Sequence, residues 1–581
     1  MALFSVDLAG GRIYTGYPMK HAKLIGWVLA VSLLAGCGEE GGRISLRLRV
    51  GQSALDARGG APVSPGQPPP DIQGFRLCVQ DPNGESLACR DFSDLSAEKF
   101  RLGDIPTGDR QVVTFQGYRA NSLTGMPEVL WCGRAVDVAI RKNATTRISL
   151  LLSRCGDCTE TPKAMSRARV FHTATRLADG RVLIAGGFSA FAETGCPEPC
   201  TELVADPTVE IYDPATGEFA PAGSLVHARG LHAAHRLPDG RVILAGGCQR
   251  VTLQSAFSDP DRPGSPIRCP DPGGAATSYE VFDPASGVSG AREMPATALA
   301  GAAGLPDGRL LLLGGIENAS PLRRGLLIDA LAGEIASIED LLAQARVLPA
   351  VVPIGGEPFE ILVAGGAQPV DYQNAGPWAD RVWVSADRVN SAVPAFASGN
   401  TAGGFPVLHA GAGLWWPGRA VISGGMYPSA FGAPDRPFTP VPLRRAAVVD
   451  LRLEQLTVLS ESSEMIDARA FHSVTPVSSD GLLVAGGFQY RDAQVPARYQ
   501  PASFVEWWDG PGAAFVPRWS FGQRVSLVRP RAGHSATRLL DGRVLLTGGL
   551  GAQGPMASAE VFDPFPSDLG TGGLPPLAPV P

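Results

Sequence analysis

Short apolar runs that end in a pair of glycines recur through the last two thirds of the chain. Four are closely similar, RVLIAGG, RVILAGG, GLLVAGG and RVLLTGG, and three others are degenerate copies. The pairs are Gly186 and Gly187, Gly246 and Gly247, Gly314 and Gly315, Gly365 and Gly366, Gly424 and Gly425, Gly486 and Gly487, and Gly548 and Gly549. Successive pairs are 60, 68, 51, 59, 62 and 62 residues apart, which indicates seven repeats of one unit.

Each repeat is expected to supply four antiparallel strands. In the first repeat, HTATRL and VLIA flank the turn Asp179-Gly180 and read as a hairpin, and Glu210 to Gly223 adds two strands around a D-P-A-T-G turn. The first strand is built from small residues and His, which suits strands that converge on an axis. We therefore predict an all-β fold in which residues 159–581 form a seven-bladed β-propeller, whose last repeat is closed by its own strand, Leu574 to Val580.

The part before the repeats has a different pattern. Residues 71–158 contain alternating apolar segments such as FRLCVQ, RQVVTFQGY and TTRISLLL, divided by turns such as DPNG. They predict a small antiparallel β-sandwich, which can include the strand candidate at residues 43–50. Residues 37–70 are otherwise rich in Gly, Pro and polar residues and are expected to be a flexible tether.

Residues 1–36 are expected to be a signal segment, with Met19 as its true start. Basic residues precede an apolar run, Leu24 to Gly36, that is too short to span a bilayer. The run ends in LAGC, which resembles the lipoprotein signal of bacteria. That resemblance implies lipidation at Cys37, cleavage before it, and an exported protein anchored at the outer membrane or cell surface. The alternative is an ordinary signal peptide with an incidental cysteine.

The repeats resemble kelch repeats of the type found in the central domain of galactose oxidase-like proteins. The resemblance rests on the run ending in Gly-Gly, the Asp-Gly-Arg turn before it and the aromatic-Asp-Pro after it. The oxidases of this family hold copper with tyrosines and histidines, one of them from a C-terminal domain. The chain ends a few residues after its last expected strand and has no adjacent Tyr-His pair. We therefore expect no metal, no cofactor and no catalytic residues.

Four histidines occupy equivalent positions, each three residues after an arginine: His172, His232, His472 and His534. Their repetition predicts a structural role, in which His and Arg bind loop backbone; a shared metal ion is the alternative.

The pairs Trp415 with Trp416 and Trp507 with Trp508 either fill gaps between blades or stack on sugar rings. We expect a non-catalytic scaffold whose loops bind an envelope protein or glycan. The alternative is a carbohydrate-directed enzyme, either an oxidase or a hydrolase using loop carboxylates.

The net charge and the cysteine content restrict the expected binding partners and the cellular compartment of the protein. The net charge of −6 offers no basic excess for phosphate backbones, so nucleic acid is excluded as a partner. Ten cysteines fit an exported protein. Candidate disulfides are Cys78 with Cys89, Cys196 with Cys200, Cys248 with Cys269, and Cys132 with either Cys155 or Cys158.

Overall fold

The structure is a computed structural model of the 581-residue chain. It describes residues 4–7, 12–15, 29–33, 43–50, 52–53, 72–93, 105–120, 127–142, 144–191, 200–254, 267–269, 273–318, 320–355, 359–366, 379–384, 389–395, 411–416, 418–428, 440–450, 455–459, 463–478, 481–490, 499–520 and 523–564.

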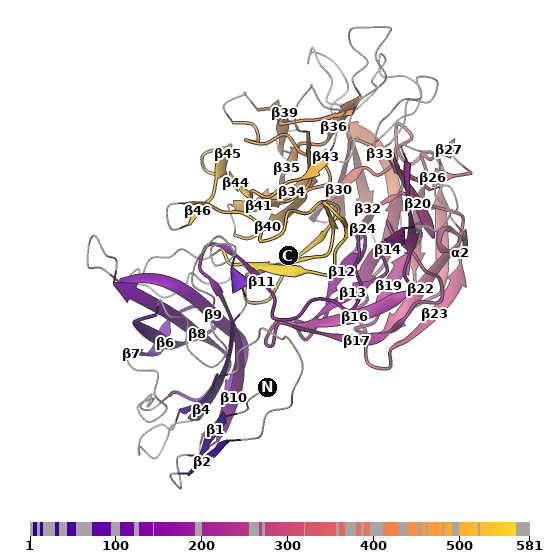
Figure 1. The fold of residues 1–581 in the computed structure, drawn as a ribbon. Helices are drawn as coiled ribbons and strands as arrows, with labels where there is room; N and C mark the ends of the chain where they lie inside the picture. The colour runs from indigo at the N-terminus through magenta and orange to yellow at the C-terminus, as the bar shows by residue number, and fades with distance from the viewer. Residues whose placement is uncertain are drawn as a thin grey trace.

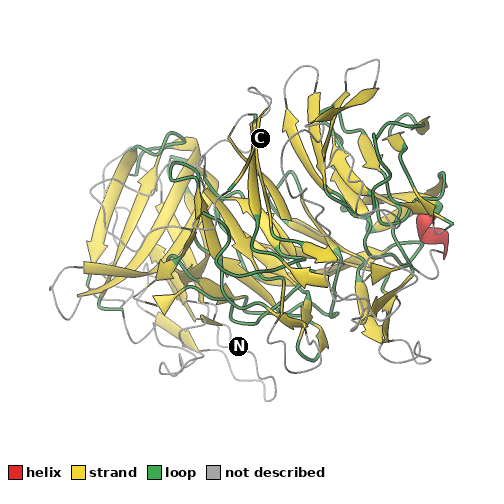
Figure 2. Cartoon of the chain, turned by 90° about the horizontal axis from the view of Figure 1, so that it is seen from above, coloured by secondary structure: helices red, strands yellow, loops and turns green. Residues whose placement is uncertain are grey.

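The regular structure of the described chain is almost entirely strand, which confirms the predicted all-β class (Figure 2). Its helix, α2 (Gly273–Ala276), has four residues. No helix in the described part has the length and apolar character needed to cross a membrane.

The N-terminal part forms a seven-stranded sheet beside the rest of the molecule (Figure 1). Its order is β3 (Leu29–Leu33), β4 (Arg43–Val50), β10 (Thr145–Arg154), β9 (Pro127–Ile140), β8 (Gly108–Ala120), β6 (Gly74–Gln80) and β7 (Ser86–Phe92). Apolar side chains from both halves of this sheet, including Leu46, Phe75, Phe115 and Trp131, form one buried core. A further hairpin consists of β1 (Phe4–Asp7) and β2 (Arg12–Thr15).

One expectation for this part is corrected. The sandwich was expected to be antiparallel, but β4 and β10 run parallel, because a long connection lets both strands start from the same edge. Residues 29–33 form β3, which pairs with β4 at the edge of the sheet. They lie in the expected signal segment, whose cleavage before Cys37 stays a prediction and would remove this edge strand. Cys37 lies outside the described residues.

Seven further sheets follow, which we call ring sheets and number in chain order. The strands of each sheet are given from the innermost strand outward. The first is β12 (Thr173–Arg176), β13 (Val182–Ala185), β16 (Thr208–Asp213) and β17 (Glu218–Ser224). The second is β18 (Ala233–Arg236), β19 (Val242–Ala245), β22 (Ser278–Asp283) and β23 (Val288–Glu293). The third is β24 (Gly301–Gly304), β25 (Leu310–Leu313), β28 (Gly325–Asp329) and β29 (Glu334–Ile338).

The remaining four have the same order. The fourth is β30 (Ala350–Gly355), β31 (Phe359–Ala364), β32 (Ala379–Val384) and β33 (Val389–Ala395). The fifth is β34 (Gly411–Trp416), β35 (Arg419–Ser423), β38 (Ala446–Asp450) and β39 (Gln455–Val458). The sixth is β40 (Ser473–Pro476), β41 (Gly481–Ala485), β44 (Glu506–Asp509) and β45 (Ala514–Pro517). The seventh is β48 (Ser535–Arg538), β49 (Val544–Thr547), β52 (Ala559–Phe562), β11 (Cys158–Glu160) and β5 (Gln52–Ser53).

Contacts between these sheets close a cycle. The innermost strands touch in the order β12, β18, β24, β30, β34, β40, β48 and back to β12. A separate apolar core fills each space between neighbours; Ile184 and Tyr212 of the first sheet, for example, pack with Leu545 and Val561 of the seventh. Each ring sheet therefore buries both faces, because its strands are apolar on both sides.

The ring closes differently from the sequence expectation. The seventh sheet takes its fourth strand from β11, which precedes the first repeat and pairs antiparallel with β52. The expected closing strand, Leu574 to Val580, lies outside the described residues. A strand from the other end of the repeat region was overlooked because Cys158–Glu160 is only three residues long.

Shorter strands lie in the loops that connect the strands of the ring sheets. One loop sheet combines β14 (Phe188–Phe191), β15 (Cys200–Ala205), β20 (Arg250–Gln254) and β21 (Ile267–Arg268). Five hairpins are β26 (Ile316–Glu317) with β27 (Ser320–Pro321), β36 (Met426–Pro428) with β37 (Pro440–Pro442), β42 (Phe488–Tyr490) with β43 (Tyr499–Pro501), β46 (Trp519–Ser520) with β47 (Gln523–Arg524), and β50 (Leu550–Gly551) with β51 (Gly554–Pro555).

Candidate functional site

A buried arginine stands before the innermost strand in four ring sheets, and each binds a buried glutamate on the third strand of the same sheet. The pairs are Arg169 with Glu210, Arg229 with Glu280, Arg469 with Glu506, and Arg531 with Glu560. In each, Nη1 of the arginine also donates to the carbonyl oxygen of the first glycine of the glycine pair. The sequence interpretation located these arginines but missed the glutamates, although the repeated Glu of EIYD, EVFD, EWWD and EVFD was a signal.

The glycine pairs join neighbouring sheets. The N–H of Gly187 donates to the carbonyl oxygen of Arg229 in the next sheet at 2.8 Å, and Gly549 does the same to Arg169 across the ring closure at 2.7 Å. A Cβ added to Gly548 would overlap the carbonyl oxygen of Arg169, and its φ of 58° disfavours side chains. The glycine pairs thus let the backbones of adjacent sheets approach.

The histidines form hydrogen bonds between ring sheets. Nε2 of His172 lies 2.8 Å from Oγ1 of Thr547, and Nε2 of His232 lies 2.9 Å from Oγ1 of Thr173. His472 and His534 bind Oγ of Ser423 and Ser473 in the same way. Burial, with a contribution from the neighbouring arginine, lowers the pKa of His232, His472 and His534 to about 3, so these rings are neutral at neutral pH.

Two positions before the innermost strand of six ring sheets lies a residue with positive φ. These residues are Phe171, Leu231, Leu299, Leu348 and Phe471, with φ of 48° to 57°, and Gly533 takes the position in the seventh sheet. Backbone hydrogen bonds link them from sheet to sheet, from Leu231 to Phe171, from Phe171 to Gly533 and from Gly533 to Phe471. Large side chains in this backbone region are strained, and such strain is typical of functional sites. At this end of the ring, therefore, a belt of apolar side chains surrounds the axis, where Phe171 and Phe471 contact edge to face.

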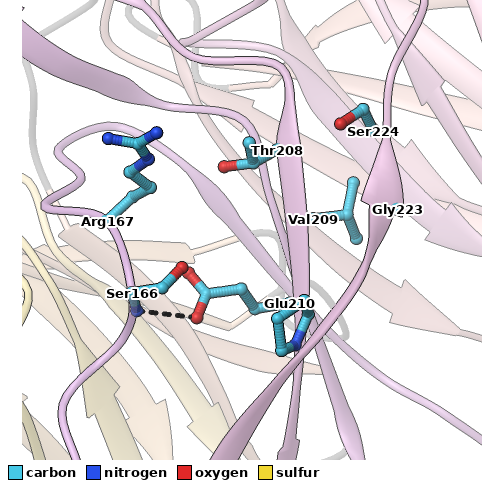
Figure 3. A pocket seen from close by; sticks show the side chains of 8 residues that line it. Ser166, Arg167, Thr208, Val209, Glu210, Gly223 and Ser224 are labelled. Atoms are coloured by element: carbon cyan, nitrogen blue, oxygen red, sulfur yellow. Dashed lines mark hydrogen bonds between the residues drawn. The ribbon is translucent and has the colours of Figure 1, made fainter.

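An open pocket of about 590 Å³ lies at the outer side of the first ring sheet. Its lining residues are Ser166, Arg167, Thr208, Val209, Glu210, Pro221, Gly223 and Ser224. The register between β16 and β17 shifts between Val209 and Glu210, and a bulge of this kind bends the strands apart. Figure 3 shows Ser166 and Glu210 together, joined by a 2.8 Å hydrogen bond from the Ser166 N–H to Oε2 of Glu210.

The pocket offers several polar groups to a ligand. The hydroxyls of Ser166 and Ser224 make no hydrogen bond with another described residue. The Arg167 side chain is 62% exposed, and its Nε lies 4.0 Å from Oδ2 of Asp206. Although burial opposes its charge, hydrogen bonds from Thr208 and the charge of Arg169 lower the pKa of Asp206. Asp206 is therefore ionised at neutral pH and attracts Arg167 toward the pocket rim.

Disulfides join Cys78 with Cys89, Cys132 with Cys155, and Cys248 with Cys269. Cys158 is a buried free thiol on the closing strand β11. Cys196 lies outside the described residues.

The tryptophan pair of the sixth sheet fills space rather than facing solvent. Trp508 is fully buried against Phe515, and Trp507 lies under the guanidinium of Arg518, which is 4.9 Å from the ring centre. The side chains of Trp415 and Trp416 lie outside the described part of the chain.

Comparison with known proteins gives weak likenesses to solved structures alone. No family model matches the chain, and no curated protein matches it. Among solved structures it is similar to a fungal alcohol oxidase of the AA5 family, determined in complex with copper. The two share 15% identity with a TM-score of 0.45, over 70% of this chain and 78% of the oxidase.

This likeness corrects one expectation from the sequence. The chain was expected to be a non-catalytic scaffold and no enzyme, whereas the similar structure is that of an enzyme, an alcohol oxidase. At this identity and TM-score it assigns no activity. Among the described residues, no three His, Cys, Asp or Glu side chains gather in an arrangement that could hold a metal ion, and Nε2 of each repeated histidine is bound to a hydroxyl.

Proposed function

We propose that the chain is an exported, lipid-anchored enzyme that acts on a carbohydrate, built on a seven-bladed kelch-type propeller. The closed cycle of seven ring sheets supports the propeller, with each ring sheet as one blade. The strand β11 supports closure of the ring, since it joins the first and last repeats. The glycine pairs support the kelch-type repeat, because they make equivalent contacts in successive sheets.

The polar pocket of the first ring sheet is the observation that carries the substrate class. Its volume of about 590 Å³ lies within the usual range of roughly 300 to 1,000 Å³ for small-molecule sites. Its lining combines hydroxyls, a guanidinium and a carboxylate. A sugar, which offers several hydroxyl donors and acceptors on a compact ring, matches these groups, and an envelope glycan is the substrate that an anchored protein would meet.

Arg167 and Glu210 have different roles in this proposal. Glu210 is buried and accepts hydrogen bonds from Arg169 and from the Ser166 N–H, so it fixes the position of the residues that line the pocket. Arg167 is exposed, and we assign it to substrate binding. The reaction class, oxidation or hydrolysis, is decided by the products: oxidation yields peroxide, and hydrolysis yields new reducing ends.

The test is an activity screen on a panel of envelope glycans, with separate detection of new reducing ends and of peroxide. We expect one of these products from at least one glycan, and we expect Arg167→Ala to raise KM because it removes a binding group. Arg181→Ala is the matched control, since Arg181 is also exposed but pairs with Asp179 in a turn. Absence of both products, or equal effects of the two substitutions, would reject the proposal.

The anchor has its own test. Cys37→Ser is expected to leave the precursor unprocessed or to release it from membranes, because cleavage and acylation both need that thiol. Stable attachment follows if several acyl chains insert, at about 0.8 kcal/mol per buried methylene. Electrophoretic mobility and detergent partitioning measure this; an unchanged mutant would contradict lipidation.

A further inference from the structure

Three arginines end the innermost strands of three consecutive ring sheets. Arg538 ends β48 in the seventh sheet, Arg176 ends β12 in the first, and Arg236 ends β18 in the second. They hold the same register, opposite Val544, Val182 and Val242. Since β12 contacts both β48 and β18, the three guanidinium groups are neighbours at one end of the ring.

One hydrogen bond and mutual electrostatic repulsion relate the three arginines. Nη1 of Arg176 donates a 2.9 Å hydrogen bond to the carbonyl oxygen of Arg538. Burial and the charge of Arg236 lower the pKa of Arg176, and burial and the charge of Arg176 lower that of Arg538. The positive charges of Arg176, Arg236 and Arg538 therefore lie close together, and no negative charge of a described residue offsets their repulsion.

No described carboxylate neutralises these arginines. The nearest turns each contain an aspartate, but it binds the arginine two residues later: Asp179 with Arg181, Asp239 with Arg241, and Asp541 with Arg543. Arg236 is exposed, and Nε of Arg538 is buried without a hydrogen-bond partner. Each of these three repeats thus leaves one positive charge unpaired.

The cluster is confined to one side of the ring. The corresponding positions of the third to sixth sheets are Gly304, Pro353, Leu414 and Pro476, which carry no charge. A chain with a net charge of −6 concentrates three unpaired cations there. Uncompensated like charges cost stability, and guanidinium groups match phosphate oxygens through paired N–H donors.

We propose that Arg176, Arg236 and Arg538 form a binding site for a phosphate group. This site lies on the innermost strands, whereas the carbohydrate pocket lies between the outer strands β16 and β17, so the two inferences are independent. The phosphate is that of a small soluble molecule or of a lipid headgroup, which present the same oxygen atoms.

Calorimetric titration with inorganic pyrophosphate at constant low ionic strength tests the site. We expect the full-length protein to bind it and Arg236→Gln to weaken binding about tenfold, as for loss of one charge-assisted contact. Arg236 is exposed and repels Arg176, so this variant is expected to keep or slightly raise the melting temperature. Arg292→Gln is the matched control, because it removes one exposed arginine from the outer strand β23.

The outcomes separate the possibilities. Binding of vesicles containing phosphatidylglycerol that is lost in Arg236→Gln, without pyrophosphate binding, would support the site and assign the phosphate to a lipid. Binding of neither probe, or equal weakening by Arg292→Gln, would overturn it. Arg167→Ala must leave pyrophosphate binding unchanged, so failure of the carbohydrate proposal would be recognised separately.

Discussion

The buried Arg–Glu pairs show how single residues specify the ring. Although burial opposes its charge, Arg229, Ser289 and backbone N–H groups lower the pKa of the Glu280 carboxyl. Arg229 is fully buried and makes hydrogen bonds to three carbonyl oxygens as well as to Glu280. Neither partner can lose the other without leaving a buried, uncompensated charge.

Removing one member of such a pair is therefore expected to destabilise the fold strongly. Glu280→Gln should lower the free energy of unfolding by about 3 to 5 kcal/mol, as for broken buried ion pairs. Asp239→Asn removes the exposed partner of Arg241 and should cost less than about 1 kcal/mol. Chemical denaturation of both variants measures the difference, and equal losses would argue against a structural role for the buried pair.

The neutral histidines predict a pH dependence. Their pKa is about 3 in the folded protein for His232, His472 and His534, against roughly 6.5 in an unfolded chain. The unfolded state therefore binds more protons below pH 6.5, and stability must fall as the pH decreases from 6.5 toward 3. Each histidine contributes about 1.4 kcal/mol per pH unit in that window.

Measuring the free energy of unfolding between pH 6.5 and 5 isolates the histidines, because carboxyl groups with lowered pKa values titrate below this range. His472→Asn should reduce the slope by about one histidine's share. A slope that stays the same in this variant would show that His472 is already charged in the folded protein.

The glycine pairs end the second strand of each ring sheet, at the point where the backbone of the next sheet comes into contact with it. Gly548→Ala is expected to destabilise the protein by about 1 kcal/mol or more, since a Cβ would overlap the Arg169 carbonyl oxygen. Gly290→Ala on β23 has nothing within 4 Å of the added Cβ and should have little effect. Melting temperatures of the two variants compare them directly; similar shifts would contradict the role of Gly548.

The strand pattern was readable from the sequence where side chains alone determine it. Apolar runs such as VLIA and the Asp-Gly turns predicted the second strands, because both faces of each ring sheet are buried. The parallel pairing of β4 with β10 and the bulge at Val209 were not readable, since they depend on contacts between distant segments. The same holds for the phosphate site: its arginines repeat visibly, but their lack of carboxylate partners is a property of the folded turns.

The whole molecule depends on one short strand that connects its two parts. β11 lies between β5 and β52 in the seventh ring sheet, directly after the N-terminal sheet ends at Arg154 (Figure 1). Polar contacts reinforce this junction: Ser153 donates to Asp563 at 2.8 Å, and Nη1 of Arg543 donates to the carbonyl oxygen of Leu151 at 2.9 Å. The ring is thus closed by a strand that the N-terminal sheet holds in place.

Interrupting β11 should therefore open the ring. Thr159→Pro removes a backbone donor opposite Val561 and is expected to cost about 3 kcal/mol or more. Thr159→Ser keeps both the N–H and the hydroxyl that accepts a hydrogen bond from the Arg154 N–H, and should stay near wild type. Hydrogen exchange of β52 reports the opening, because its amides that face β11 lose their partner strand only in the proline variant, whereas those that face β49 keep theirs. Unchanged protection of β52 in Thr159→Pro would mean that the seventh sheet closes without β11.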